Sequence, residues 1–282
     1  MKFSLVISIK NRTKLFRRSL KLYNKQLFDK NDWELVIVDD MSTEPVLATL
    51  KEYGKRINWQ YIKMDSHKND FPIYWGPALS NNIGFKAAKG DVIGITGPEM
   101  LMKETSIQYA YETAMKGKTP YGHILHSAPA FVSLIDRTPP MEQWSFDQLF
   151  MNKWAKVQDI TKNTFYWFFC ATKKENIMAI NGCDEEFMRG ICGDDDDFAN
   201  RINILAPKTH DFRIIGIHQD HSFEDRGDKK RIRRNRTWEE ARIRNTKYLQ
   251  EWYTKRNKDP VANKNRHWGS SKLIIEKVDN KI

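Results

Sequence analysis

Cysteines, long apolar runs and a leader-like start are scarce or missing in this 282-residue sequence. Its three cysteines, an odd number, show no Cys-x-x-Cys spacing, which argues against a disulfide framework and against a zinc site. No apolar run approaches the roughly 18 residues that a membrane span needs. The sequence opens on a strand-like run at 3–9 instead of a signal peptide. We therefore expect reduced thiols and a cytoplasmic protein without a membrane span.

Two glycine-rich nucleotide motifs are missing as well. No G-x-G-x-x-G follows the first strand-like run, and no G-x-x-x-x-G-K-[ST] occurs. Their absence argues against a Rossmann dehydrogenase and against a P-loop enzyme. The sequence does contain 40% hydrophobic and 12% aromatic residues, which suffice for a large buried core.

The net charge of +11 comes entirely from the end of the chain. Residues 226–282 hold 18 basic and 7 acidic side chains, whereas residues 1–225 hold 29 of each. This distribution excludes a uniformly basic, histone-like protein. Three interpretations of the basic segment stay open: a solvated helical face with a linker, a loop that neutralises the phosphates of a ligand, and a surface for nucleic acid or an anionic membrane.

The first ninety residues alternate between strand and helix patterns. We predict buried strands over 3–9, 34–38, 59–63 and 92–96, with helices between them over 14–26, 45–53 and 78–88. Short apolar strands separated by ten-residue helices indicate βαβ units and a parallel sheet. Ligands of such sheets collect at the carboxyl ends of the strands. Asn11, the Asp39-Asp40 pair and residues 97–99 are therefore candidate site positions.

The remaining two thirds of the chain give weaker patterns. We predict helices over 105–116, 174–180, 195–205 and 238–253, and strands over 164–172 and 212–217. The final thirty residues contain Pro260 and few apolar residues, and we expect them to wrap around the body or to fray.

The first polar cluster, Asp39-Asp40-Met41-Ser42, ends the second strand. Carboxylates and a hydroxyl at such a tip accept hydrogen bonds from a base or a ribose. The same residue types also occur in ordinary strand-to-helix turns, where Asp and Ser act as caps. Both interpretations stay open.

The second cluster is the run Gly193-Asp194-Asp195-Asp196-Asp197-Phe198. Four consecutive carboxylates raise one another's proton affinity unless a cation, hydrogen-bond donors or a dipole compensates. A solvated acidic turn at a helix start is the simpler explanation. The glycine-rich, apolar residues before the run favour a general base with acceptor-binding carboxylates beside it.

The third cluster is the pair His218-x-x-His221, which follows the strand predicted over 212–217. A pair of histidines by itself is more often a surface feature. With Glu99, which follows the strand at 92–96, the pair would form an oxygen and nitrogen site for Mn²⁺ or Mg²⁺.

The order and spacing of these pieces resemble the family 2 glycosyltransferases with a GT-A fold, over about residues 2–252. Residues 4–8 with Asn11-Arg12 are similar to the family's opening strand and nucleotide-binding turn. The segment Val36-Ile37-Val38-Asp39-Asp40-Met41-Ser42 is similar to its uridine-binding V-D-D-x-S segment. Residues 77–90 are similar to the helix before its metal motif. The resemblance implies an α/β fold with a Rossmann-like, mostly parallel central sheet, flanking helices and a basic helical C-terminal extension. It divides the chain into a transferase domain, 1–225, and a basic loop, helix and extension, 226–282.

The resemblance also implies which residues bind the donor and the metal. The donor-binding residues are Asn11, Arg12, Asp39, Asp40, Ser42, Asn82, Lys229 and Lys230. Where the family usually has D-x-D, this sequence has Gly97-Pro98-Glu99. Glu99 matches the second acid and is the implied metal ligand, whereas Gly97 offers no side chain.

The C-terminal half is similar to the β1,4-galactosyltransferases. Residues 181–187 resemble their N-G-F-x-x-x-[FY] segment, and residues 193–201 resemble their G-E-D-D-D-x-x-x-R helix start. By this match Asp195 is the catalytic base, and Asp194 and Asp196 bind or orient the acceptor. The same match makes His221 a metal ligand, with His218 as a second candidate.

The implied activity is inverting, divalent-metal-dependent transfer from a nucleotide-diphosphate sugar, expected to be a UDP-sugar, to an acceptor hydroxyl, expected on a glycan. Mn²⁺ or Mg²⁺ is the implied cofactor. Within the aromatic run 165–169, Trp167 is a candidate for stacking on the acceptor, although such runs are also typical of buried strands. The basic segment at 226–236 favours a loop that closes over the donor. Two alternatives stay open: a transferase acting on modified bases in DNA, and a non-catalytic nucleic-acid-binding module on the same scaffold.

Overall fold

The first hundred residues fold as their alternating pattern predicts. The computed structural model describes residues 1–65, 76–127, 147, 168–221, 236–255, 259–271 and 273–280. Its first four strands are β1 Phe3–Ile9, β2 Trp33–Asp39, β3 Asn58–Met64 and β4 Val92–Thr96, and they run parallel to one another. The connecting helices are α1 Thr13–Tyr23, α2 Val46–Tyr53 and α3 Ala78–Ala87. Each predicted element is present, with ends that differ by at most three residues.

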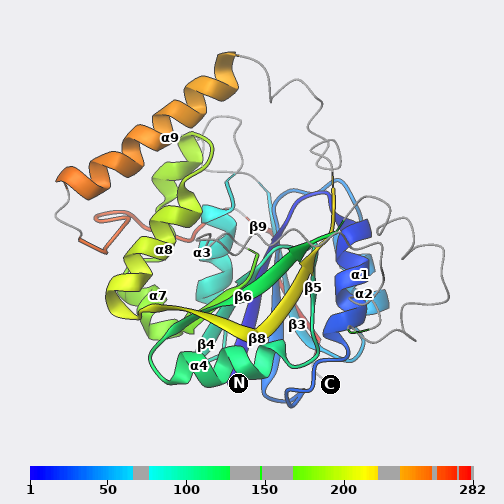
Figure 1. Cartoon of the computed structure of the whole chain (residues 1–282). Helices are drawn as coiled ribbons and strands as arrows, with labels where there is room; N and C mark the ends of the chain where they lie inside the picture. Colours follow the sequence, from blue (N-terminus) through cyan, green and yellow to red (C-terminus); the bar gives the residue numbers. More distant parts are fainter. Residues whose placement is uncertain are drawn as a thin grey trace.

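The described residues after β4 add five strands and several helices. The strands are β5 Met100–Met102, β6 Thr119–His126, β7 Cys170–Lys173, β8 Lys208–His218 and β9 Leu273–Asn280. The helices are α4 Ser106–Met115, α7 Lys174–Ala179, the 3₁₀ helix η2 Glu185–Arg189, α8 Asp194–Leu205 and α9 Arg236–Lys255. The nine described strands form one sheet, and α9 packs on η2, away from the sheet (Figure 1).

The sheet has the strand order β5-β8-β6-β7-β4-β1-β2-β3-β9. Its centre, β3-β2-β1-β4, is parallel, and so is the pair β6–β8. The pairs β3–β9, β4–β7, β6–β7 and β5–β8 are antiparallel. The predicted mostly parallel sheet is therefore correct for its centre, while the described sheet as a whole is mixed.

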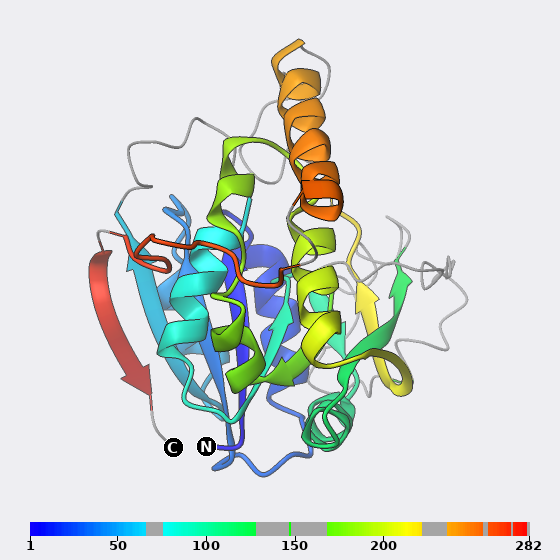
Figure 2. The same cartoon turned by 90° about the vertical axis from the view of Figure 1, so that its left-hand side faces the viewer.

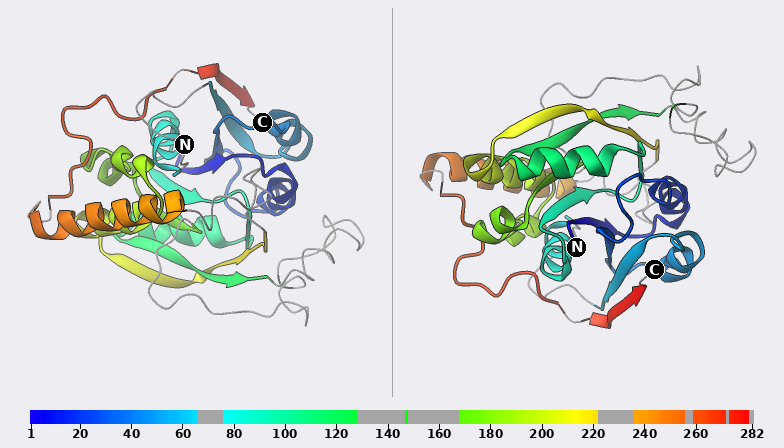
Figure 3. Two further views of the ribbon diagram at one scale, coloured as in Figure 1. Left: turned by 90° about the horizontal axis from the view of Figure 1, so that it is seen from above. Right: turned by 90° about the horizontal axis from the view of Figure 1, so that it is seen from below.

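Helices cover both faces of the sheet. Side chains of α1, α2 and α4 join one buried cluster, and side chains of α3, α7 and α8 join a second cluster on the opposite face. Seen from above and below, α1 and α2 lie on one side of the central strands and α3 lies on the other (Figure 3). Along β1, Leu5 and Ile7 belong to the first cluster and Val6 to the second. A strand buried on both faces needs a continuous apolar run, which explains the unbroken run at 3–9.

The described C-terminal residues wrap around the body, one of the two outcomes expected for them, and end in a strand of the same sheet, which was not predicted. Strand β9 pairs antiparallel with β3, with Tyr61 opposite Val278. Residues 259–271 cross in front of α3 before β9 begins (Figure 2). The Asn263 amide nitrogen donates to the carbonyl oxygens of Asn181 and Cys183. The domain boundary predicted at 225 falls outside the described residues. The strand predicted over 164–172 overlaps β7, and its residues 164–167 also lie outside the described residues.

Strand β6 has no counterpart among the predicted elements, and β8 is longer than predicted. Pro120 and Gly122 interrupt the apolar pattern of β6, and both residue types are unfavourable in strand interiors. The β6–β8 register shifts between Gly122 and His123. In the part of the chain that the structure describes, no helix combines the length and apolar character needed to cross a bilayer.

Candidate active site

Asp39 closes the turn at the end of β2. Its side chain is completely buried, with Oδ1 accepting from the Ser42 backbone N–H at 2.7 Å and Oδ2 accepting from the Tyr61 hydroxyl at 2.6 Å. Met41 turns the chain with a left-handed φ of 57°. Burial and the Asp39 carboxylate both raise the pKa of Tyr61, so this hydroxyl stays a donor to Asp39. Asp40 follows, 4% exposed.

Asn11 links the end of β1 to the same turn. Its backbone has a φ of 48°, a left-handed conformation that Asn tolerates better than most residues. Its N–H donates to Ser42 Oγ at 3.0 Å, and its Oδ1 accepts from the N–H groups of Thr43 at 2.8 Å and Glu44 at 3.3 Å. The predicted donor residues Asn11, Asp39 and Ser42 are therefore brought together, and hydrogen bonds fix their geometry.

Glu99, His218 and His221 form the cluster predicted for a metal. One ligand atom from each lies within 4.8 Å of the others. Glu99 Oε1 is 3.4 Å from His218 Nε2 and 3.8 Å from His221 Nε2. The other carboxylate oxygen of Glu99, Oε2, lies 2.7 Å from Nη1 of Arg12. Arg12, which follows Asn11, thus joins the cluster predicted for a metal.

The carboxyl group of Glu99 is ionised despite its burial. Only 8% of the residue is exposed, and burial raises the pKa of a carboxyl group. The Arg12 guanidinium and the neighbouring imidazoles of His218 and His221 outweigh that effect and hold the pKa of Glu99 well below its usual value. The cluster therefore contains a buried, ionised carboxylate that is paired with Arg12.

The donor set fits Mn²⁺ or Mg²⁺. The Nδ1 atom of His218 and both ring nitrogens of His221 are buried, and among the described residues they have no hydrogen-bond partner. Buried polar groups that protein atoms leave unsatisfied call for a ligand, an ion or water. One carboxylate with two imidazoles is a mixed oxygen and nitrogen set, which suits Mn²⁺ better than the all-oxygen sets that Mg²⁺ prefers.

Gly97 replaces the first acid of the family motif, and the structure shows what its missing side chain permits. A Cβ atom at this position would lie 2.8 Å from both Cδ and Oε1 of Glu99, closer than real Cβ contacts. The Glu99 carboxylate therefore occupies the space that a side chain at 97 would need.

Gln219 anchors the histidine turn and was not among the predicted site residues. It is completely buried. Its Nε2 donates to the carbonyl oxygens of Glu99 at 3.0 Å and Leu15 at 3.1 Å, and its Oε1 accepts from Arg18 at 3.0 Å. This residue joins the ends of β4, β8 and α1, so it fixes where the two histidines stand relative to Glu99. Its position between the histidines is the only sequence signal for it.

The acidic run begins α8 and divides into two roles. Asp197 is buried and pairs with Arg201 at 2.6 Å, with both side chains 1% exposed. Arg201 also donates to the carbonyl oxygens of Gly182 at 2.8 Å and Ile180 at 3.3 Å. Asp197 therefore fixes the helix in place and is not one of the predicted catalytic or acceptor-binding residues.

Asp195 has the proton affinity expected of a general base. Its burial, followed by the neighbouring charges of Asp194 and Asp196, raises the pKa of Asp195 to about 7. The Asp196 backbone N–H donates to Asp195 Oδ1 at 3.0 Å and opposes this rise only in part. A carboxyl group with this pKa both accepts and releases a proton near neutral pH.

Topology brings the three clusters to one edge of the sheet. Because β1, β2 and β4 are parallel, their carboxyl ends share an edge. Strands β4 and β6 are both antiparallel to β7, so they run in the same direction. Strand β8 is parallel to β6 and therefore also ends at this edge. Helix α8 runs opposite to β8 (Figure 1), so its N-terminus with Asp195 lies toward that edge.

Other predicted residues lie elsewhere or outside the description. Asn82 is completely buried; its amide nitrogen donates to the Cys183 carbonyl and to Glu185, and its oxygen accepts from the Cys183 N–H. These bonds join α3 to the segment before η2, and the structure does not bring Asn82 together with the donor residues. Trp167, Lys229 and Lys230 lie outside the described residues.

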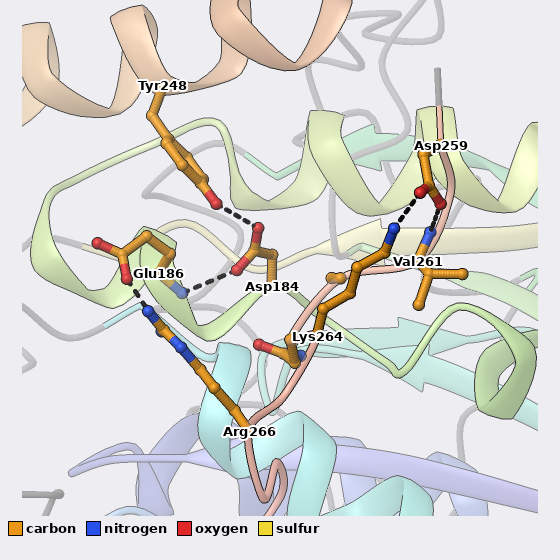
Figure 4. A pocket seen from close by; sticks show the side chains of 9 residues that line it. Asp184, Glu186, Tyr248, Asp259, Val261, Lys264 and Arg266 are labelled. Carbon is orange, nitrogen blue, oxygen red and sulfur yellow. Dashed lines mark hydrogen bonds and ion pairs between the residues drawn. The ribbon is translucent and has the colours of Figure 1, made fainter. Parts of the chain in front are cut away.

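A separate pocket of about 360 Å³ lies between η2, α9 and residues 259–266 (Figure 4). Its polar groups bond to one another: the Tyr248 hydroxyl donates to Asp184 at 2.7 Å, and Arg266 pairs with Glu186 at 3.0 Å. None of its lining residues comes from a strand end. We therefore place the candidate active site at the sheet edge and not in this pocket.

Comparison with known sequences identifies the family. The sequence profile of "Glycosyl transferase family 2" matches residues 4–153, more than half of the chain. The chain belongs to glycosyltransferase family 2. The matched span contains Asn11, the turn at 39–42 and Glu99, whereas Asp195 and the two histidines lie beyond it.

One curated relative of this family 2 chain is the poly(ribitol-phosphate) beta-N-acetylglucosaminyltransferase TarS of Staphylococcus aureus. The two sequences are 29% identical over 106 residues, which make up 37% of this chain and 18% of TarS. The chain therefore matches less than a fifth of the length of this relative. The predicted likeness of the C-terminal half to the β1,4-galactosyltransferases stays a prediction.

Solved structures establish the GT-A fold of this family 2 chain. TarS residues 1–349 in complex with UDP-GlcNAc align with a TM-score of 0.58 at 15% identity, covering 81% of this chain and 61% of that one. The mannosyltransferase PcManGT of Pyrobaculum calidifontis, in complex with GDP-Man and Mn²⁺, aligns with a TM-score of 0.57 at 15% identity, covering 92% and 64%. The predicted GT-A fold is confirmed, whereas the basic helical C-terminal extension stays a prediction.

Proposed function

We propose that the chain is an inverting, divalent-metal-dependent glycosyltransferase that moves a sugar from a UDP-sugar to a hydroxyl group of a glycan acceptor. The observation that carries this proposal is the meeting of three groups at one sheet edge. These are the hydrogen-bonded turn at Asp39 and Ser42, the Glu99–His218–His221 cluster, and a carboxyl group, Asp195, whose pKa is raised to about 7.

Asp195 is the proposed general base. Above pH 7 its carboxylate takes the proton of the acceptor hydroxyl while the acceptor oxygen attacks the anomeric carbon. The bond to the diphosphate breaks on the opposite side, so one displacement inverts the configuration. A positioned base of matched pKa contributes about 10²- to 10⁴-fold to such a step. Asp194 and Asp196 are the proposed acceptor-orienting neighbours.

Glu99, His218 and His221 are the proposed ligands of the cation. When bound, a divalent cation supplies positive charge that stabilises a departing diphosphate. The chain itself holds the ligands: Gln219 ties the histidine turn to the Glu99 carbonyl, and Arg12 fixes one carboxylate oxygen. Lys229 and Lys230, which lie outside the described residues, are proposed to neutralise the diphosphate.

The donor class is supported by the fold relatives. The S. aureus structure contains UDP-GlcNAc and the P. calidifontis structure contains GDP-Man with Mn²⁺, so sugar nucleotides of both bases belong in the test. We favour UDP because the V-D-D-x-S segment, which resembles a uridine-binding segment, is present as Val38-Asp39-Asp40-Met41-Ser42.

A donor panel tests the proposal. UDP- and GDP-sugars are incubated with the protein and Mn²⁺, and released nucleoside diphosphate is measured with and without glycan acceptors. We expect release from a UDP-sugar that a chelator stops and that an acceptor accelerates. The matched variant Asp195→Asn should lose acceptor-dependent release while still binding the donor. Release from no donor, or full release by Asp195→Asn, would contradict the proposal.

A further inference from the structure

The two oxygens of Glu99 face different partners. Oε1 faces the Nε2 atoms of His218 and His221 at 3.4 and 3.8 Å, and Oε2 pairs with Arg12 NH1 at 2.7 Å. The ion pair is buried, with Arg12 7% and Glu99 8% exposed. A guanidinium therefore already neutralises the carboxylate that the proposed function assigns to a cation.

The charge of this cluster is close to zero. Glu99 supplies one negative charge and Arg12 one positive charge, and Gly97 supplies none where the family usually has a second acid. A divalent cation that approaches the histidines is attracted by Glu99 and repelled by Arg12 from a few ångströms away, where screening by water is weak.

Arg12 has donors to spare for another anion. Its NH2 atom is buried and has no hydrogen-bond partner among the described residues. Arginine binds phosphate through two parallel N–H groups. A diphosphate brought beside the cluster would satisfy this nitrogen and would add the negative charge that the cluster lacks.

We propose that Arg12 couples cation binding to diphosphate binding, so that the cluster takes up a divalent cation tightly only together with the donor's diphosphate. This inference rests on the proposed function, because the diphosphate belongs to the donor. By pairing with Glu99, Arg12 weakens the site for a cation alone. By pairing with the diphosphate, Arg12 makes the two ligands strengthen each other. Arg12 is thus a positioning residue, acting on the cation through Glu99.

Binding of Mn²⁺, followed by the electron paramagnetic resonance signal of the free ion, tests this coupling without turnover. For the wild-type protein we expect weak Mn²⁺ binding alone and binding at least about tenfold tighter with saturating UDP. For Arg12→Gln, which removes the charge, we expect Mn²⁺ alone to bind about tenfold tighter than to wild type, while UDP binds more weakly. The ratio of the Mn²⁺ affinities with and without UDP should fall toward one.

Two further variants separate charge from general damage. Arg12→Lys keeps the charge and should keep the weak binding of Mn²⁺ alone. Arg17→Gln removes a charge from α1, the helix that begins directly after Arg12. The Arg17 guanidinium lies 5.8 Å from the Tyr53 ring centroid, and this variant should behave as wild type. Thermal unfolding checks that each variant is folded.

The outcomes distinguish the inference from the proposed function. If Arg12→Gln is folded and binds Mn²⁺ alone no better than wild type, the inference is overturned while the proposed function stands. If Arg12→Gln does not fold, the wild-type comparison decides: Mn²⁺ affinity equal with and without UDP overturns the inference. If wild type binds Mn²⁺ under neither condition and binds neither UDP nor GDP, the proposed function itself fails.

Discussion

The carboxylate of Glu99 occupies the space above the α-carbon of Gly97, so that a Cβ atom there would lie 2.8 Å from Oε1. The observed position of the Glu99 carboxylate therefore requires glycine at 97, in addition to the absence of an acid there. It lets one carboxylate reach Arg12 and two histidines together.

Gly97→Ala should disturb the cation site without removing any of its residues. The added methyl group displaces the Glu99 carboxylate by several tenths of an ångström, and we expect the Mn²⁺ concentration for half-maximal activity to rise about tenfold, in line with typical costs of disturbing the support of a metal ligand. The measurement is a Mn²⁺ titration of activity. Gly117→Ala is the control, because its φ of 75° makes alanine strained but no atom lies within 4 Å of the added group.

The activity should rise with pH through about 7. The pKa of Asp195 is raised to about 7 by burial and by Asp194 and Asp196, so the base is protonated below that value. We expect kcat/KM to fall about tenfold for each pH unit below the pKa of the base. In Asp196→Asn one repelling charge is gone, and the midpoint of the profile should move to lower pH. An unmoved midpoint would count against Asp195 as the titrating group.

The same shift makes Asp195 costly for stability at neutral and higher pH. A carboxyl group whose pKa is higher in the folded state than its ordinary 3.8 favours folding when protonated, and that contribution is lost as pH rises from about 4 through about 7. Asp195→Asn should therefore unfold at a higher temperature than wild type at pH 8 and at a similar temperature at pH 4. Equal differences at both pH values would contradict the assigned shift.

The pair of Arg201 and Asp197 should be the ion pair on which helix α8 depends. Arg201→Met leaves Asp197 charged and buried and frees the carbonyl oxygens of Gly182 and Ile180, so we expect a loss of about 3 kcal/mol or more in the free energy of unfolding. Arg242→Met is the matched control, since its i,i+3 pair with Glu239 is exposed and its loss should leave the free energy of unfolding nearly unchanged. Urea unfolding measures both.

Local patterns in the sequence predicted the centre of the fold and several site residues. The strand tips at Asn11 and Asp39 follow from apolar runs and the parallel βαβ pattern alone. The approach of Glu99 to His218 also follows, once both are placed at strand ends on the same edge. These features depend on neighbours in sequence or on a topology that the alternating pattern already dictates.

Features set by distant contacts were not predicted. Strand β9 exists because β3, more than two hundred residues earlier, offers an edge for pairing, and its own composition shows little of this. Asn82 matches a family segment, yet its side-chain amide nitrogen donates hydrogen bonds to the Cys183 carbonyl and to Glu185, about a hundred residues later in the chain. The pairing of Arg12 with Glu99 depends on side-chain directions that spacing does not encode.

The stereochemistry of the product tests the central claim most directly. With the UDP-sugar and acceptor found by the donor panel, proton NMR of the freshly formed product reports the configuration at the anomeric carbon. A single displacement assisted by Asp195 predicts that an α-linked donor gives a β-linked product. A product that retains the α-configuration would contradict the account.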